Sequence, residues 1–352
     1  MDAWAVVEYA RPLEKVQLPK HEAVGTEVVI AVTHCGVCHS DVHLWEGFYD
    51  LGAGRRLSFA QRGTKLPIAP GHEIAGVVIR RGPEAHAVKL GSPQIVYPWL
   101  GCGKCVPCSR EEDNLCTAQT SLGVVRQGGF AAEVVVPHPR YLVDLGELDP
   151  AVACTYACSG MTALHAVRDL GPQHPDDCVV VIGTGGLGLA AIHVLRALGH
   201  ELIVAVDLSE MNRQAAVQAG AAAAFSSAEE GVQNLIRDAI HGARVTGVID
   251  FVNVSATAAL AFSIVDKGGR MAQVGLMGGE LQLSLVGLIG KALTITGTNT
   301  GNLSHFREIL SLAKSGKLVP PPIKTMPWDQ AADAMTLLRD SKVTGRLVLV
   351  KE

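Results

Sequence analysis

Hydrophobic residues in the first 150 positions fall in short runs of the kind that form β-strands. Each run is either apolar throughout or alternates apolar with polar residues, and Gly, Pro or Asn bounds it. The expected strands are Val28–Thr33, Ala75–Arg80, Ile95–Pro98 and Ala132–Pro137. The pattern therefore predicts a β-rich first part with long connecting loops.

From about Ser159 the pattern changes, and short apolar strands alternate with segments of helical length. The expected helices are Gly160–Asp169, Gly186–Leu198, Glu210–Ala219, Glu229–Ile240 and Ala256–Val265. The expected strands are Cys178–Ile182, Leu202–Asp207, Gly247–Asn253 and Arg270–Gly275. This alternation is typical of βαβ crossovers, so it predicts a doubly wound parallel sheet and the α/β class.

The last fifty or so residues contain further helix and strand signals without a low-complexity linker. A helix is expected near Leu303–Ser315, and the prolines at 320–322 break the pattern after it. A second helix is expected at Asp329–Arg339, and a final strand at Arg346–Val350. We find no long internal repeat in the sequence.

Composition narrows the class of protein. A chain of 352 residues is long enough for two domains, and its 48% hydrophobic and 18% charged residues exclude disorder. Its 30 Lys and Arg against 34 Asp and Glu give a net charge of −4 with no basic run, so we expect no nucleic-acid or membrane partner. The first residues carry no secretion signal, which favours a cytoplasmic location.

A glycine-rich turn follows the expected strand that ends at Ile182. Gly183, Gly185 and Gly188 form the pattern G-x-G-x-x-G between this strand and a helix. The first glycine permits the sharp turn, the second lets the backbone approach a pyrophosphate, and the third allows close packing of helix and strand. Because a helix N-terminus also favours phosphate, the turn predicts a dinucleotide site rather than a turn that only packs.

Asp207 ends the next expected strand, 19 residues after Gly188. A carboxylate at this position accepts hydrogen bonds from the adenosine ribose and repels a 2′-phosphate, so it favours NAD over NADP. Arg213 follows on the next helix, either as a contact to the ribose or phosphate or as a solvated charge. The two readings of Arg213 stay open on the sequence.

The nine cysteines are an odd number, and clustered cysteines in a cytoplasmic protein more often bind metal than form disulfides. Four of them have the spacing C-x2-C-x2-C-x7-C, namely Cys102, Cys105, Cys108 and Cys116. Four such thiolates can complete a closed, structural zinc site. Spacing alone also permits an iron–sulfur cluster or a redox relay, whereas the acidic surroundings disfavour a nucleic-acid zinc ribbon.

Three further segments each carry a weak signal for chemistry. Residues 35–43 read C-G-V-C-H-S-D-V-H, and we place them on the loop after a strand. Gly71-His72-Glu73 opens another strand, and Cys158-Ser159-Gly160-Met161-Thr162 begins a helix. Taken separately, a His-Glu pair is usually a surface or core feature, and a lone cysteine is usually a small buried hydrophobe.

Together these segments resemble the zinc-dependent alcohol dehydrogenases of the medium-chain dehydrogenase/reductase superfamily. Five motifs occur in the family's order, and Gly345-Arg346 resembles the start of its terminal strand. The resemblance covers essentially the whole chain. It implies a β-rich, GroES-like catalytic domain made of residues 1–155 and 292–352, with a structural zinc lobe at residues 98–118. Residues 156–291 are then the Rossmann NAD-binding domain.

The resemblance also implies two zinc ions per chain. The ligands of the catalytic zinc correspond to Cys38, His72 and Cys158, with Cys154 as a competing candidate for the last position. Two thiolates, one imidazole and an open position make a catalytic type of site. The four cysteines of the lobe hold the second, structural zinc.

Other residues match the family's catalytic machinery. Glu73 is expected behind the zinc, and Asp41 is the carboxylate expected to orient His72. Ser40 and His43 match a proton relay that leads from the alcohol to water. Further cofactor contacts are expected at His39, Thr162, Gly186, Leu187, Val274, Gly275, Leu276 and Arg346.

The activity that the resemblance implies is hydride transfer between a primary or secondary alcohol and NAD, giving an aldehyde or ketone. Its partners are these small molecules, together with further copies of the chain in a homodimer or homotetramer. The alternatives are a polyol or nicotinoprotein dehydrogenase, or a non-catalytic NAD-binding zinc protein. The loop Leu44–Pro70 is longer than is typical of the family, so we expect it to shape the pocket or an oligomer contact.

Overall fold

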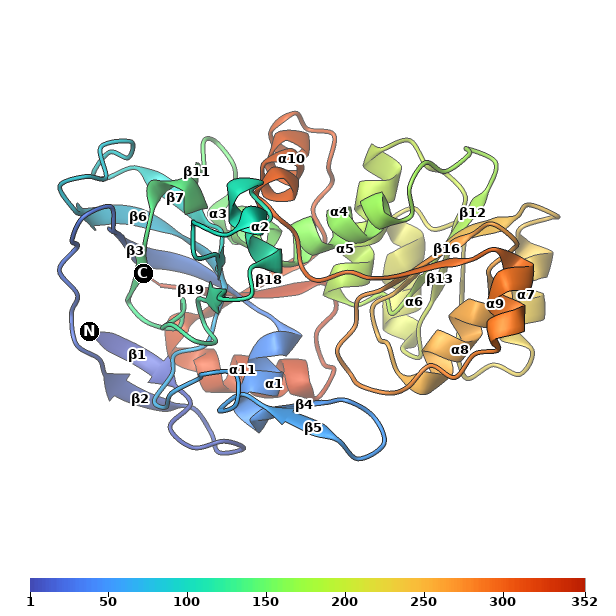
Figure 1. The fold of residues 1–352 in the computed structure, drawn as a ribbon, viewed down its shortest axis with the longest axis horizontal. Helices are drawn as coiled ribbons and strands as arrows, with labels where there is room; N and C mark the ends of the chain where they lie inside the picture. The colour runs from blue at the N-terminus through green and yellow to red at the C-terminus, as the bar shows by residue number, and fades with distance from the viewer. Residues whose placement is uncertain (352) are drawn as a thin grey trace.

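The computed structural model describes residues 1–351, which form two bodies that each have a sheet of their own (Figure 1). The body on the left of Figure 1 contains the blue and teal strands and both ends of the chain. The body on the right contains the yellow and most of the orange elements. The chain therefore leaves the first body, builds the second, and returns.

The sheet of the first body has seven strands, most of them in antiparallel pairs. In spatial order six of them are β11 (Leu142–Asp144), β7 (Pro93–Val96), β6 (Glu73–Arg81), β3 (Val28–Val37), β19 (Arg346–Val350) and β18 (Ile323–Pro327). The seventh, β10 (Glu133–Val136), also pairs with β3. Because β3 pairs with both β6 and β19, the N-terminal and C-terminal parts of the chain share one core.

Short elements surround this sheet. The three hairpins or ribbons pair β1 (Asp2–Ala5) with β2 (Glu14–Gln17), β4 (Phe48–Asp50) with β5 (Arg56–Ser58), and β8 (Trp99–Leu100) with β9 (Thr120–Ser121). The short helices are α1 (His39–Glu46), α2 (Val106–Ser109) and α3 (Pro150–Ala153). Single 3-10 turns are η1 (Asp113–Leu115), η2 (Pro139–Tyr141), η3 (Cys154–Ala157) and η4 (Trp328–Gln330).

The sheet of the second body has six strands, all parallel. In spatial order they are β14 (Ala223–Phe225), β13 (Ile203–Val206), β12 (Cys178–Ile182), β15 (Val245–Asp250), β16 (Arg270–Gln273) and β17 (Thr294–Gly297). Helices cover the sheet, so every residue of β12 is buried. These helices are α5 (Gly186–Ala197), α6 (Glu210–Gln218), α7 (Val232–Ala239), α8 (Ser255–Ile264) and α9 (Leu285–Lys291).

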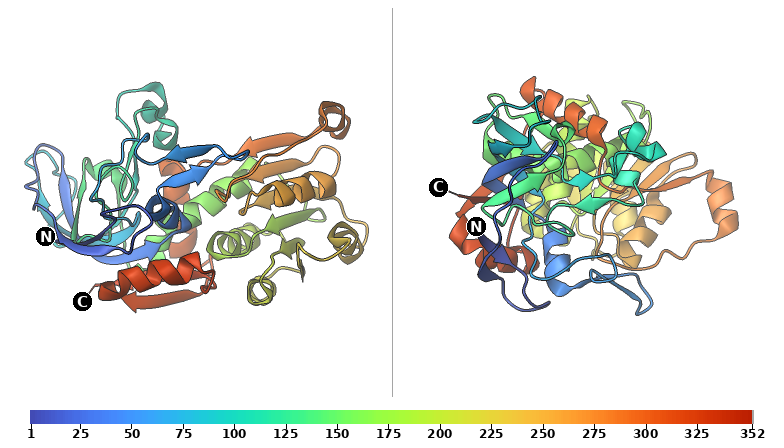
Figure 2. Two further views of the ribbon diagram at one scale, coloured as in Figure 1. Left: turned by 90° about the horizontal axis from the view of Figure 1, so that it is seen from below. Right: turned by 60° about the vertical axis from the view of Figure 1, so that its left-hand side comes forward.

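Helices also join the two bodies. Helix α4 (Ser159–Asp169) leads from the first body into the second, and it packs against both α5 and α10 (Leu303–Lys314). Helix α11 (Ala331–Arg339) lies beside α1 in the first body (Figures 1 and 2). Helix α4, through its contacts with α5 and α10, therefore links the two bodies.

The predicted α/β class is confirmed, and β12 and β19 occur at the predicted bounds. The interpretation of residues 35–43 as a loop was wrong. Strand β3 continues through Val37, and helix α1 begins at His39. Cys38 is the N-cap residue, and its backbone N–H donates to the Asp41 carboxylate at 2.8 Å. This local bond starts a helix of only eight residues that apolar periodicity does not reveal.

One strand lies outside the body in which the sequence placed it. Residues 292–352 were expected in the first domain, but β17 pairs with β16 in the parallel sheet.

No helix within residues 1–351 combines the length and the apolar composition that a membrane crossing needs.

Candidate active site

Helix α1 presents several polar side chains at the end of β3. Cys38 caps the helix, and Ser40, Asp41 and His43 lie on its first two turns. The buried Asp41 carboxylate accepts hydrogen bonds from the backbone N–H groups of Cys38, at 2.8 Å, and Gly71, at 2.9 Å. It thereby ties the start of α1 to the residues that precede β6.

Cys38, His72 and Cys158 come together from three distant segments of the chain. All three are buried, and their ligand atoms lie within 4.8 Å of one another. The His72 Nδ1 lies 3.2 Å from the Asp41 carboxylate, so the ring donates there. In the neutral ring, which is the form that binds a metal, the buried Nε2 then carries the lone pair, and within residues 1–351 this atom has no hydrogen-bond partner. An unpartnered imidazole nitrogen beside two thiols is the donor set that zinc prefers.

These side chains alter one another's protonation. A hydrogen bond with Cys158 is the main cause that holds the pKa of Cys38 well below its usual range, and the charge of His72 adds to it against burial. The same hydrogen bond and burial raise the pKa of Cys158. Burial lowers the pKa of His72, but Asp41 and Cys38 outweigh it and raise the pKa. A thiol pair that shares a proton in this way loses that proton to solvent readily when a metal cation binds the sulfurs.

Glu73, which follows His72 directly, forms a buried ion pair with Arg346, with a nitrogen–oxygen distance of 2.5 Å. Burial raises the pKa of Glu73, and the guanidinium opposes this rise. The other carboxylate oxygen of Glu73 accepts a hydrogen bond from the backbone N–H of Ser159 at 3.1 Å. Glu73 thus joins β6, the C-terminal strand β19 and the start of α4 at one point.

The other predicted residues of this region lie nearby. The His43 ring is 5.5 Å from the His39 ring, and its Nδ1 is 3.7 Å from the Glu46 carboxylate. Burial and the neighbouring His39 lower the pKa of His43, so its ring is neutral near pH 7. The Trp99 ring lies 5.3 Å from the His72 ring, which places this tryptophan beside the three ligand atoms. Thr162 is buried on the first turn of α4.

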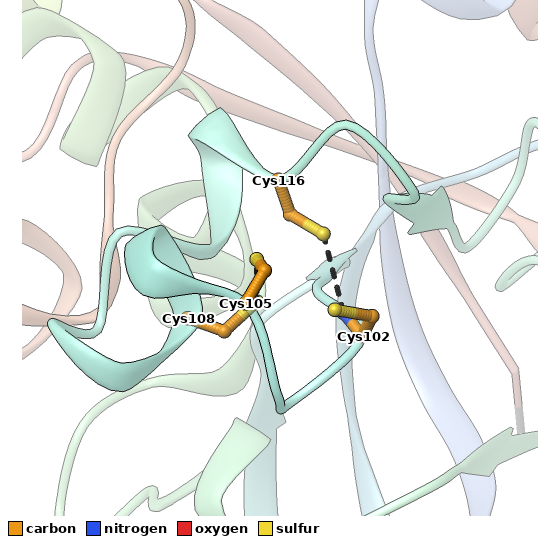
Figure 3. A group of neighbouring side chains, drawn as sticks. All are labelled: Cys102, Cys105, Cys108 and Cys116. Atoms are coloured by element: carbon orange, nitrogen blue, oxygen red, sulfur yellow. Dashed lines mark hydrogen bonds between the residues drawn. The ribbon is translucent and has the colours of Figure 1, made fainter.

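The four cysteines of the lobe also meet at one point (Figure 3). Their four sulfur atoms lie within 4.8 Å of one another, and none of the nine cysteines within the described chain is in a disulfide. The Cys102 backbone N–H donates to the Cys116 sulfur at 3.3 Å, and the sulfurs of Cys105 and Cys108 are 3.4 Å apart. Backbone N–H groups of Lys104 and Cys105 lower the pKa of Cys102 to about 6. This donor set fits a tetrahedral structural zinc.

The lobe is fixed to the rest of the molecule by polar contacts. The buried carboxylate of Asp113 accepts bonds from the Arg140 guanidinium and, at 2.8 Å, from the Tyr141 hydroxyl. Asn114 and Asn299 exchange side-chain and backbone hydrogen bonds at 3.0 and 3.2 Å. The lobe therefore braces the segment that leads from the second body into α10.

The glycine-rich turn joins β12 to α5 in the geometry that its pattern predicts. Gly183 has a φ of 82°, and a Cβ at Gly188 would lie only 2.0 Å from the Gly183 oxygen. Beside Gly185 the space is open, since no atom of the described residues lies within 4 Å of an added Cβ. A Cβ at Gly186 would lie 2.5 Å from the Arg346 side chain. The turn thus leaves a free backbone surface, next to Leu187 and the buried arginine, that fits a pyrophosphate.

Asp207 lies at the end of β13, beside this turn. Its carboxylate accepts the backbone N–H groups of Thr184, at 2.7 Å, and Ser209, at 2.8 Å. The Thr184 hydroxyl, at 3.4 Å, and the Asn212 side-chain amide, at 3.3 Å, also donate to this carboxylate, so a ribose hydroxyl would replace one of these longer side-chain contacts. Arg213 donates to the backbone oxygens of Asp207 and Leu208 at 2.9 and 2.8 Å, so it closes the end of β13 and is not a free solvated charge.

The expected contacts beyond β16 occupy a neighbouring turn. Val274 is buried, and the Gly275 oxygen accepts a hydrogen bond from the Asn253 side chain at 3.0 Å. A Cβ at Gly275 would lie 2.3 Å from the Val252 oxygen, which explains the glycine. Leu276 is 51% exposed. This turn follows β16, so it lies at the same edge of the sheet as the glycine-rich turn.

The structure brings most of the sequence candidates together and also adds residues. Cys154 is buried four residues before Cys158, but the cluster of ligand atoms contains Cys158. Tyr49 is one of the aromatic residues of the long loop that was expected to shape the pocket, but the sequence did not predict that its ring would lie 5.3 Å from the His43 ring. It also did not predict that Arg55 would pair with Glu280 of the second body at 2.9 Å. The length and composition of the loop Leu44–Pro70 indicated only that it shapes the pocket or an oligomer contact, and not which of its residues make these contacts.

Comparison with known proteins agrees with this geometry. Residues 24–147 match the family described as the alcohol dehydrogenase GroES-like domain, and residues 186–315 match the zinc-binding dehydrogenase family. The chain is 35% identical over 351 residues to an NAD-dependent alcohol dehydrogenase of Sulfurisphaera tokodaii, covering 99% of this chain and 100% of the relative. The chain thus belongs to the zinc-dependent alcohol dehydrogenases of the medium-chain dehydrogenase/reductase superfamily.

Other relatives and solved structures extend the comparison. A D-arabinose 1-dehydrogenase (NADP(+)) of Saccharolobus solfataricus is 31% identical, over 97% of this chain and 95% of its own. The alcohol dehydrogenase of Aeropyrum pernix superimposes with a TM-score of 0.90 at 26% identity, over 99% of this chain and 100% of that one. The predicted two-domain architecture of the family is confirmed by this likeness.

Proposed function

We propose that this chain interconverts an alcohol and an aldehyde or ketone with NAD, at a zinc site formed by Cys38, His72 and Cys158. The observation that carries the proposal is the buried His72 Nε2, which has no partner among the described residues and lies within 4.8 Å of two thiols. When bound, zinc supplies Lewis acidity toward the substrate oxygen and NAD supplies the hydride acceptor. Cys102, Cys105, Cys108 and Cys116 hold a second zinc that has a structural role.

The protein's own residues prepare the site for this chemistry. Asp41 fixes the tautomer of His72, and its two backbone hydrogen bonds keep the carboxylate in place. The ion pair of Glu73 with Arg346 places a buried, compensated carboxylate behind the ligands. Trp99 excludes water from the side of His72.

Oxidation of an alcohol releases a proton, which must leave a largely buried site. Ser40 lies two residues after Cys38 on α1, and we assign its hydroxyl as the group that takes this proton. His43, one turn further along α1, is the base that passes the proton to water. The lowered pKa of His43, caused first by burial, leaves the ring free to accept it at neutral pH.

The nucleotide site favours NAD over NADP. Open space beside Gly185 accommodates a pyrophosphate at the start of α5. We assign Asp207 to the adenosine ribose. The residues assigned to the pyrophosphate are Gly183, Gly186, Leu187 and Gly188. His39, Thr162, Arg213, Val274, Gly275, Leu276 and Arg346 complete the proposed cofactor contacts.

We assign residues 1–155 and the last part of the chain to the catalytic domain. Since β17 pairs in the parallel sheet, the second boundary is best placed after Gly297 rather than at residue 292.

We also propose a homodimer or homotetramer. In support, β17 is an edge strand, and Leu285, Val286 and Ile289 of the preceding helix are each more than 70% exposed. The free state of all nine cysteines supports a reducing, cytoplasmic environment.

A screen for NAD reduction tests the function directly. Purified protein is incubated with aliphatic, aromatic and cyclic alcohols, and NADH is followed by its absorbance. We expect turnover with at least one alcohol class and a preference for NAD over NADP. Absence of NADH with every class, in protein shown to contain zinc, would contradict the proposal.

A further inference from the structure

The hairpin of the long loop reaches from the first body to the second. Its strands β4 and β5 follow helix α1, and residues 51–55 form the turn between them. The hairpin extends away from the first sheet toward the second body (Figures 1 and 2). There the Arg55 guanidinium lies 2.9 Å from the carboxylate of Glu280, in the segment that follows β16. The long loop thus connects the two bodies.

Glycines let these two segments approach each other at the level of the backbone. A Cβ at Gly52 would lie 2.5 Å from the Glu280 side chain and 2.9 Å from the Gly279 oxygen. A Cβ at Gly278 would lie 2.6 Å from the Asp50 oxygen. Because these distances are too short for a Cβ, the contact needs glycine on both sides. The ion pair therefore reinforces a close contact between two backbones.

Each side of this contact is held in place within its own body. In the first body, the Asp50 carboxylate accepts a hydrogen bond from the Gly52 N–H at 2.8 Å, which closes the turn of the hairpin. In the second body, the Glu280 N–H donates to the Ser255 hydroxyl at 2.9 Å, which ties the segment to the first turn of α8. The contact can therefore open without unfolding either segment.

The contact also lies close to the proposed cofactor site. Residues 274–276 are assigned to the cofactor, and Gly278 follows them after one intervening residue. At the other end, the hairpin begins directly after α1, and the Tyr49 ring in β4 lies 5.3 Å from the His43 ring. The proposed cofactor contacts come from both bodies, so the dinucleotide lies between the bodies that the hairpin connects.

We propose that the tip of the hairpin, residues 50–55, is a strap that holds the two bodies together around the bound cofactor and must detach before NADH can leave. The inference rests on the proposed function, because it requires a dinucleotide that contacts both bodies. Any change that weakens the contact raises the rate of NADH release by the factor by which the open state becomes more populated. An exposed ion pair suits a contact that opens in every turnover, since such pairs add little stability.

A matched pair of glycine substitutions tests the strap. Gly52 and Gly54 lie in the same turn with φ of 80° and 74°, so alanine is strained to a similar extent at both. At Gly52 the new Cβ meets the second body, whereas beside Gly54 no atom of the described residues beyond its chain neighbours lies within 4 Å. The rate of NADH release from zinc-loaded enzyme is measured by stopped-flow fluorescence. We expect Gly52→Ala to release NADH about tenfold faster than the wild type, and Gly54→Ala to stay within about twofold.

A charge exchange tests the ion pair separately. Arg55→Glu and Glu280→Arg each place like charges at the contact, and the double variant restores opposite charges. We expect each single variant to release NADH about threefold faster than the wild type, and the double variant to return to within about 1.5-fold of it.

The outcomes separate the parts of the inference. If Gly52→Ala releases NADH no faster than Gly54→Ala, the strap is overturned. If the double charge variant releases NADH as fast as the single variants, the role of the ion pair is overturned. A wild type that does not bind NADH would instead refute the proposed cofactor site, so failure of the inference and failure of the proposed function are distinguishable.

Discussion

A single carboxylate, Asp41, determines which ring nitrogen of His72 is available to bind a metal. It accepts two backbone N–H groups and lies 3.2 Å from the Nδ1 of His72. These contacts leave the Nε2 of His72 as the only ring atom with a free lone pair. His72 therefore has one ring nitrogen free to bind a metal. In an ordinary core histidine both ring nitrogens usually have hydrogen-bond partners.

Asp207 is expected to set the choice of cofactor. Asp207→Asn retains an oxygen that can accept the Thr184 N–H but removes the charge that repels a 2′-phosphate. We expect the ratio of kcat/KM for NAD to that for NADP to fall by about tenfold to a hundredfold, because this loss relieves about 1–3 kcal/mol of discrimination. Steady-state kinetics with both cofactors measures it.

The control for this substitution is Glu210→Gln, which removes an exposed carboxylate from the adjacent helix α6. It should leave the cofactor ratio within about twofold of wild type, since exposed charges are well screened. An unchanged ratio in Asp207→Asn would show that another group discriminates between the cofactors.

Single residues with a motif around them could be predicted from the sequence, but loop residues could not. Cys158 ranked above Cys154 because of the residues that follow it, and the cluster of ligand atoms includes it. Tyr49 was expected only as part of a loop that shapes the pocket, because its contact with His43 depends on a chain reversal that returns it to α1. The position of a side chain after such a reversal follows from tertiary contacts and not from local pattern.

At the scale of elements, two histidines stack where α4 packs against α10. The rings of His165 and His305 are 4.4 Å apart and nearly parallel, and the His165 Nδ1 lies 2.6 Å from the Thr300 oxygen. Burial, followed by the charge of His165, lowers the pKa of His305 to about 4, against the favourable charges of Glu308 and Asp169. This interface therefore tolerates a neutral His305 far better than a charged one.

The stability of this interface should depend on pH. The unfolded chain protonates His305 near pH 6.5, while the folded chain resists protonation until about pH 4. Stability is thus complete above about pH 6.5 and is lost as the pH falls toward 4. We expect His305→Gln to reduce the loss of unfolding free energy between pH 7 and 5 by about 1 kcal/mol, allowing for the partial exposure of the ring.

Urea denaturation at the two pH values measures this difference. His174→Gln removes an exposed histidine of the same chain and should leave the pH dependence as in the wild type. If His305→Gln has the same pH dependence as the wild type, the proton uptake on unfolding comes from other groups.

The elements themselves were largely predictable where apolar periodicity is strong. Strand β12 and the turn after it occur as the sequence indicates, because a buried parallel strand is a continuous apolar run. Helix α1 was missed since it has only eight residues and begins at a local cap, in which the Cys38 N–H donates to the Asp41 carboxylate. Short helices of this kind carry little periodic signal.

At the scale of the whole molecule, the chain builds one body from both of its ends. Strand β19 pairs with β3, and this places Arg346 between Glu73 and the start of α5. The return of the C-terminus is therefore what joins the ligand side of the first body to the nucleotide side of the second. Sequence order alone does not reveal such an arrangement, which followed from the family resemblance and is seen in the sheet order.

We expect the chain to hold two separate zinc sites, and we assign Cys158 to the catalytic one. Zinc content by mass spectrometry, together with NADH production, tests it in the wild type and in Cys158→Ala, with Cys178→Ala as a control at a buried spare cysteine. We predict two zinc ions per wild-type and Cys178→Ala chain. We predict one zinc ion and a loss of turnover of more than about a thousandfold in folded Cys158→Ala. A Cys158→Ala enzyme that keeps two zinc ions and full turnover would contradict the account.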